Sequence, residues 1–123
     1  MTLGTYEAKP VGSQAVETTT VTIANGASLS GAVDLGGRKL VGIIMPDTWT
    51  AAGLTFQGSI DGTNFFNVYD GSSERTVNVA ASYYSALALS DWVGFRWIKI
   101  RSGTAASAVN QAAERVLTLV VQP

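Results

Sequence analysis

The acidic residues are the side chains in this sequence from which a catalytic site could be built. The chain has no histidine and no cysteine, which excludes Ser-His-Asp and Cys-His nucleophile systems and zinc held by histidine or cysteine. A pair of carboxylates could still hydrolyse a glycosidic bond. Most of the aspartates, however, stand beside Gly, Pro or Ser, where capping of a turn is their ordinary role. We therefore predict no catalytic residue and a protein that is not an enzyme. The acids are Glu7, Glu17, Asp34, Asp47, Asp61, Asp70, Glu74, Asp91 and Glu114.

Two further stretches contain residues that bind metals or phosphates in other proteins. "SIDGTNFF" has Asp61 and Asn64 but lacks the D-x-D-x-D spacing of a calcium loop. Gly36 and Gly37 precede two cations, yet no phosphate-binding glycine motif is present. We interpret both stretches as turns and predict no metal site and no cofactor.

The stretch "GFRWIKIRSG" combines two aromatics with cations on what reads as a β-strand. Side chains alternate between the two faces of a strand, so the isoleucines at 98 and 100 share one face, which suits a core. The other face would carry Phe95, Trp97, Lys99 and Arg101. Aromatics and arginine anchor protein interfaces, so we interpret this face as a docking surface, with a core position as the open alternative for Trp97.

Further candidates for an interface are other aromatics and part of the small-residue stretch 102–115. An aromatic with a few polar neighbours also suits a sugar platform, and composition does not separate the two kinds of site. Trp49 and Trp97 are the candidates for stacking on a sugar. Besides the four residues above, the predicted interface residues are Trp49, Tyr83, Tyr84, Asn110 and Gln111.

Length and composition indicate one domain that works through its surface. The chain has 123 residues, 46% of them hydrophobic, which is enough to bury a core without disulfides. Only 14% of residues are charged, against about a quarter in an average soluble domain, so part of the surface is expected to meet a partner. The net charge of −1 is spread without blocks, and no apolar run approaches a membrane span, so we predict neither a nucleic-acid nor a membrane partner.

The order of residues along the chain is typical of an all-β fold. We expect a polar, flexible N-terminal arm over 1–14 and a β-sandwich domain over 15–123. Asn25-Gly26 and Asp61-Gly62 are hairpin-turn dipeptides, and about eight strands with turns this regular predict an antiparallel sandwich or barrel. The segment 102–115 is left open between a long ordered loop and a short helix. The predicted strands are 16–24, 28–35, 39–45, 54–60, 65–69, 76–80, 84–89, 95–101 and 115–122.

The words "LVGIIMPDTWTAAGLTFQ", "IKIRSGT" and "VNQAAERVLTLV", within about residues 22–121, resemble a group of small proteins from tailed bacteriophages. The resemblance implies a jelly-roll-like sandwich and a virion structural protein. It implies no catalytic residue, because that group has no established active site.

From this resemblance we expect a capsid decoration (cement) protein on the capsid surface of the virion, made in the cytoplasm of the host bacterium. Its partners would be copies of itself, as a homo-oligomer for which a trimer would suit the threefold positions of a capsid, and the major capsid protein or another virion protein. The alternative is a carbohydrate-binding or fibre-associated module of the tail or head fibre.

Overall fold

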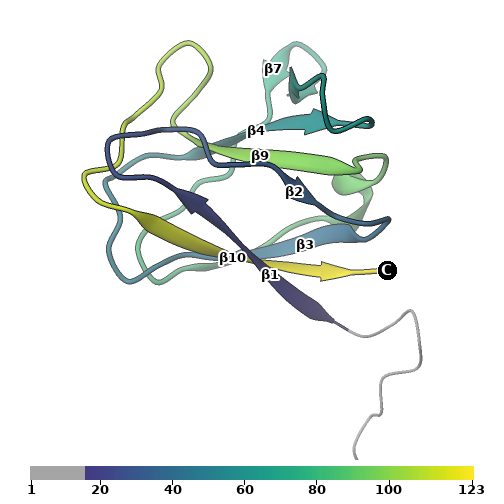
Figure 1. Ribbon diagram of the computed structural model, residues 1–123, viewed down its shortest axis with the longest axis horizontal. Helices are drawn as coiled ribbons and strands as arrows, with labels where there is room; N and C mark the ends of the chain where they lie inside the picture. Colours follow the sequence, from purple (N-terminus) through teal and green to yellow (C-terminus); the bar gives the residue numbers. More distant parts are fainter. Residues whose placement is uncertain (1–15) are drawn as a thin grey trace, which may run out of the picture.

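The computed structural model describes residues 16–123, and within them the chain forms a β-sandwich of two antiparallel sheets (Figure 1). The predicted arm, 1–14, lies outside the described residues. Sheet A has the order β1 (Glu17–Ile23), β10 (Arg115–Gln122), β3 (Lys39–Ile44) and β8 (Tyr84–Ala86). Sheet B has the order β2 (Val33–Asp34), β9 (Trp97–Ser102), β4 (Leu54–Ser59) and β5 (Phe66–Asn67). A small hairpin, β6 (Tyr69–Asp70) with β7 (Ser73–Glu74), and a 3-10 helix, η3 (Leu89–Trp92), complete these elements.

The strand pairing has the pattern of a jelly roll. β1 pairs with β10, β2 with β9, β3 with β8 and β4 with β5, so these strands form one long hairpin that folds over between the two sheets. One arm of that long hairpin is β1 to β4 and the other is β5, β8, β9 and β10, and along each arm successive strands alternate between sheet A and sheet B. The small β6–β7 hairpin is inserted between β5 and β8. This is the double Greek-key order of jelly-roll sandwiches. The predicted fold class is therefore confirmed.

The core lies between the two sheets and is built from the inward residues of each strand. Ile98 and Ile100 of β9 are fully buried, as the alternation predicts. Trp92 of η3 closes the core against Phe56 of β4, with ring centroids 4.6 Å apart in an edge-to-face arrangement. The other members of the core are Val21, Ile23, Leu35, Leu40, Ile43, Met45, Leu54, Val68, Leu117, Leu119 and Val121.

Several predicted boundaries change in the structure. The segment 102–115 is an ordered loop and contains no helix, which decides between the two alternatives. The predicted strand 76–80 is reduced to a single bridge between Val77 and Leu54. Continued alternation from Leu54 and Phe56 would place Ile60, the last residue of the predicted strand 54–60, on the core face. β4 instead ends at Ser59 and the chain turns at Asp61-Gly62, so Ile60 is 82% exposed. No helix within residues 16–123 is long and apolar enough to cross a membrane.

Candidate interaction surfaces

The outer face of sheet B holds three of the four residues predicted as a docking surface. Trp97, Lys99 and Arg101 alternate with the buried isoleucines of β9 and point away from the core, as the sequence predicts. Phe95 does not. It precedes β9, packs against the core cluster and lies 5.9 Å from Trp92 between ring centroids. The alternation fails for Phe95 because the residue stands outside the regular strand.

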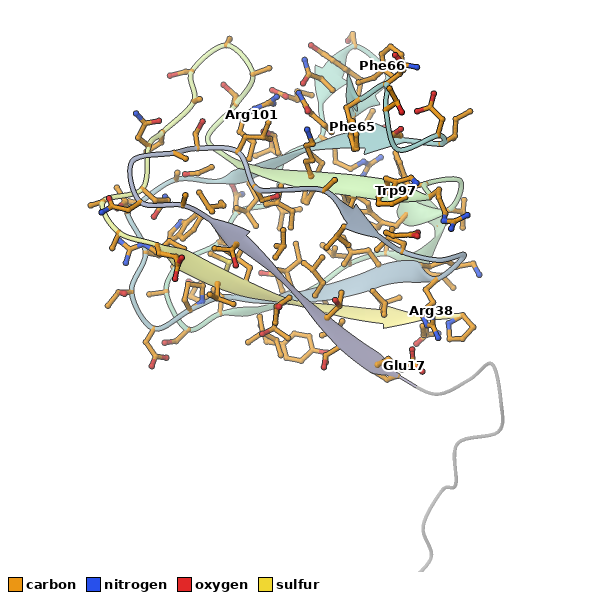
Figure 2. All side chains as sticks on the ribbon, in the orientation of Figure 1. Glu17, Arg38, Phe65, Phe66, Trp97 and Arg101 are labelled. Atoms are coloured by element: carbon orange, nitrogen blue, oxygen red, sulfur yellow. The ribbon has the colours of Figure 1, made fainter. Side chains whose placement is uncertain are left out.

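The chain's own loops lie over Trp97 and Lys99. A Cβ built on Gly62 would be 2.8 Å from Cε2 of Trp97, so the Asp61-Gly62 turn sits directly against the indole. The ammonium of Lys99 lies 4.4 Å from the centroid of the Phe65 ring, in cation–π contact. Figure 2 shows Phe65 and Trp97 on this upper layer. Both outward side chains therefore have partners within the subunit and are half-buried.

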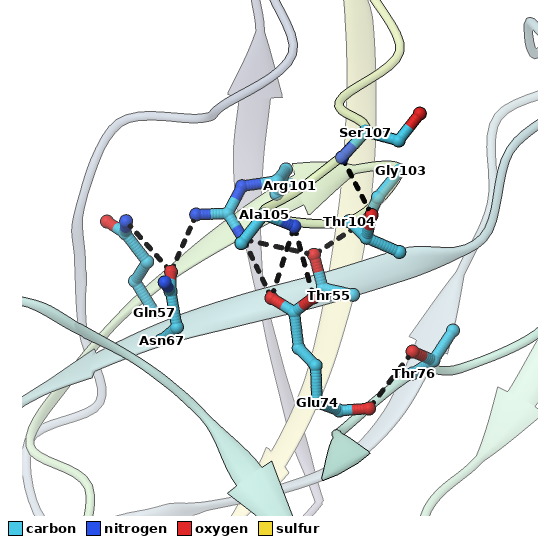
Figure 3. A network of polar contacts seen from close by, with 10 residues as sticks. All are labelled: Thr55, Gln57, Asn67, Glu74, Thr76, Arg101, Gly103, Thr104, Ala105 and Ser107. Atoms are coloured by element: carbon cyan, nitrogen blue, oxygen red, sulfur yellow. Dashed lines mark hydrogen bonds and ion pairs between the residues drawn. The ribbon is translucent and has the colours of Figure 1, made fainter.

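Arg101 is the most enclosed residue of this face, with 7% of its surface exposed. Its guanidinium donates to Glu74 Oε2 at 3.0 Å, to Asn67 Oδ1 at 2.8 Å and to Thr55 Oγ1 at 3.3 Å (Figure 3). Glu74 also accepts a hydrogen bond from the backbone N–H of Ala105. A buried ion pair is tolerated when further hydrogen bonds satisfy both charges, and here they do.

The Arg101 network joins β4, β5, β7 and the loop after β9. Arg101, which the sequence assigns to a docking surface, instead uses its charge inside the subunit and leaves little surface for a partner. The outer face of sheet B is largely covered by the chain's own loops, which pack against it.

A second polar network explains Gln111, which was predicted as an interface residue. Gln111 is 1% exposed; its amide donates to the Thr50 carbonyl and to Ser102 Oγ, and its Oε1 accepts from Thr50 N–H and from Arg115 Nε. It fastens the loop 102–115 to the loop that follows β3. Gln111 is therefore a buried residue that holds two loops of the same subunit together, and it is not available to a partner protein. Its neighbour Asn110 is exposed.

Trp49 is half-buried against the core, and its indole N–H donates to the Ala52 carbonyl at 3.0 Å. Tyr83 and Tyr84 are both more than half exposed. Of the predicted aromatic candidates, these two tyrosines remain the most accessible.

An open groove of about 370 Å³ lies beside the free edge of β5. Its floor includes Gly58, Val68 and Phe95. Its walls carry Ile60 and Phe66, which are 82% and 70% exposed, together with Tyr69, also more than half exposed. We call this the Phe66 groove. Exposed large apolar side chains that gather in one place mark an interaction site more often than isolated ones do.

The outer face of sheet A is a second continuous surface. Residues paired across strands share a face, so Thr20, Thr118, Ile44 and Tyr84 form one row. The neighbouring rows bring the remaining members of this face, of which Gly42 and Val120 are buried. They are Thr18, Thr22, Lys39, Gly42, Ala86, Val116, Val120 and Gln122. The Tyr84 ring covers Gly42, where a Cβ would lie 2.8 Å from Tyr84 Cε1.

The carboxylates serve turns and ion pairs. Hydrogen bonds from the backbone N–H groups of Asn64 and Thr63 hold the pKa of Asp61 well below its usual range. A hydrogen bond from Arg96 lowers the pKa of Asp34. Within residues 16–123, no three acidic side chains lie together as metal ligands would.

The Phe66 groove is the surface that the sequence interpretation missed. Three apolar residues at 60, 66 and 69 around a DG turn were its signal, but the sequence pattern places them within the predicted strands 54–60 and 65–69 and gives no sign that they meet. Comparison with known proteins does not add to this geometry: no protein-family model and no curated protein matches the chain.

Proposed function

We propose that this protein is a structural component of a bacteriophage virion, a decoration protein that stabilises the capsid by adding contacts between subunits. The sequence resemblance supplies the setting. The observation that carries the proposal is the Phe66 groove, an exposed apolar site on a rigid sheet edge with room for side chains of another protein chain.

The groove suits a protein partner because of its chemistry. Covering one large aliphatic or aromatic side chain contributes roughly 1.5–3 kcal/mol before the cost of association is subtracted. Ile60, Phe66 and Tyr69 together supply an anchor of the kind found at the centre of interfaces. Each contact would be modest, but a decoration protein repeats it at every capsid position that it occupies.

The rigidity of the groove also supports the proposal. Gly58 of the floor pairs with Ile98 on one side and with Phe66 of the wall on the other, so both groove residues are held in sheet B. On its other side Arg75 bridges Asp70 and Asp91, which ties the β6–β7 hairpin to η3. A preformed site avoids the entropy cost of ordering its residues upon binding.

The experiment measures the temperature at which heated phage particles release their DNA. Particles of the phage that encodes this chain, made with the gene deleted, should release their DNA at a lower temperature than wild-type particles. Added wild-type protein should restore the release temperature, whereas Ile60→Lys protein should not. Ala106→Lys, which puts the same charge at another exposed position, is the matched control and should restore it. Equal release temperatures with and without the protein would contradict the proposal.

A carbohydrate-binding module of a fibre is the second candidate, favoured by the same groove. Phe66 and Tyr69 place two exposed rings beside the polar Ser59 and Asn67. The stacking candidates named from the sequence, Trp49 and Trp97, are both half-buried. Glycan-array binding that Tyr69→Ala removes would establish this candidate, and a flat array would reject it.

A further inference from the structure

We propose that the outer face of sheet A pairs with the same face of a second copy of this chain, with the strands of the two copies antiparallel. This deepens the proposed function, since it names the surface through which the expected homo-oligomer would form.

The composition of this face suits a symmetric contact. Lys39, at the end where β3 begins, is its one charged residue, and the others are threonine, glutamine, small or apolar residues and one tyrosine. In an isologous dimer each patch meets its own copy, so a charge near the twofold axis would face its equivalent. A face whose charged residue stands at its end, away from the centre, avoids that repulsion. Threonine, valine and isoleucine also form a surface with few rotamers to immobilise.

The other sheet offers no comparable face among residues 16–123. The outer side of sheet B carries Lys99 and Arg101. It is covered by the Asp61-Gly62 turn, by Phe65 and by Glu74 of the β6–β7 hairpin. On sheet A, as far as residues 16–123 show, the Tyr84 ring covers Gly42 and Val120 is buried, whereas the three threonines that β1 places on this face and Val116 are exposed. Sheet A is therefore the face left open to a second subunit.

The charges at the two ends of sheet A indicate the relative direction of the copies. At the end where β3 begins, Arg38 is paired with Glu17, and Lys39 is paired across the strands with Gln122 (the labelled Glu17 and Arg38 mark this end in Figure 2). At the opposite end, β3 leads to Asp47 and Glu114 precedes β10, and both acids are exposed. Antiparallel packing places the lysine end of one copy over the acidic end of the other. Parallel packing would place like charges together.

The size of the face predicts a weak, reversible dimer. Four strands about 4.8 Å apart and about six residues long at 3.3 Å per residue cover roughly 400 Å². A standard interface buries about 800 Å² on each partner, so this face provides about half. Dimerisation should therefore depend on protein concentration, and it would be promoted where many copies gather on a particle.

The test is sedimentation equilibrium of the full chain over a wide concentration range. The wild-type protein should shift from monomer to dimer, and Thr20→Arg and Thr118→Arg should each weaken the dimer at least tenfold. Ala106→Arg, which puts the same charge at an exposed loop position outside sheet A, should dimerise as the wild type does. Circular dichroism melts confirm that each variant is folded.

Charge variants test the direction. Lys39→Glu and Asp47→Lys should each weaken the dimer, and the double variant should recover it. A wild-type protein that stays monomeric at every concentration, a trimer, or a Thr118→Arg variant that is folded and still dimeric would overturn the proposal. A protein that is monomeric in solution but present on purified particles would contradict the dimer and support the proposed function. A protein that dimerises through sheet A but is absent from particles would support the dimer and contradict the proposed function.

Discussion

Arg101 shows how this chain uses inside the subunit a charge that strand alternation places on an outward face. The side chain alternates outward from β9, yet Glu74, Asn67 and Thr55 enclose its guanidinium. A cation in this position stabilises the fold only while its anion is present, because an unpaired buried charge is costly.

We expect Glu74→Ala to lower the free energy of unfolding by about 3 kcal/mol, since it leaves Arg101 without its anion. The double variant Arg101→Met, Glu74→Leu should recover most of that loss. Urea denaturation provides the measurement. The matched control is Arg96→Ala, which breaks the exposed Arg96–Asp34 pair and should cost at most about 1 kcal/mol. Equal losses for Glu74→Ala and Arg96→Ala would contradict the role assigned to Arg101.

Asp61 gives a pH dependence with a definite sign. Its pKa is lower in the folded chain than in the unfolded chain, because Asn64 and Thr63 donate to the carboxylate. As the pH falls below about 4, the unfolded chain takes up the proton first, so the stabilisation by Asp61 is present above that pH and declines below it. Asp61→Asn should therefore be less stable than the wild type at pH 7, and the difference should shrink between pH 4 and pH 2. Denaturant titrations across this range are the measurement. A difference that does not change with pH would refute the assignment.

At the scale of the elements, the edge of sheet B depends on a close approach between Gly58 and Phe95. Gly58 shares the core-facing side of β4 with Leu54 and Phe56, and a Cβ there would lie 2.5 Å from Cε1 of Phe95. The absence of a side chain at 58 is what lets the Phe95 ring reach Trp92 and close the groove floor.

We expect Gly58→Ala to destabilise the protein by about 1–3 kcal/mol through this overlap. In a Phe95→Ala background the same change should cost much less, because the overlapping ring is gone. A double-mutant cycle measured by urea denaturation gives the coupling. Additive losses would show that the ring and the glycine do not meet.

The strands also show which local patterns are informative. Alternation placed Trp97, Ile98, Lys99 and Ile100 correctly, because all four lie within β9. It failed for Phe95 and Ile60, which lie just outside β9 and β4. Gln111 was misassigned for another reason: nothing local shows that Thr50 and Arg115 will surround it.

At the scale of the whole molecule, the sandwich class could be predicted from the turns and the β texture, whereas the jelly-roll order could not. β1 pairs with β10 across nearly the whole described chain, and no local pattern encodes a pairing of that separation. The jelly-roll expectation came from the resemblance. The Phe66 groove was also beyond prediction, since it arises where residues of β4, β5, β6 and the turn before β9 meet.

The molecule presents two open surfaces of different kinds, the Phe66 groove at an edge of sheet B and the threonine-rich outer face of sheet A. A decoration protein needs contacts with the shell and benefits from contacts with its own copies. Two separate surfaces allow both contacts to form at the same time, so weak individual contacts can add through multivalency.

The central proposal is that this protein is a phage virion component that covers its apolar surfaces with other virion chains. Quantitative mass spectrometry of purified particles of the phage proposed to encode it tests this most directly. A decoration protein should be present in a copy number comparable to that of the major capsid protein. A protein absent from the particles would contradict the account, and one present only at the few copies of a tail component would contradict the decoration role.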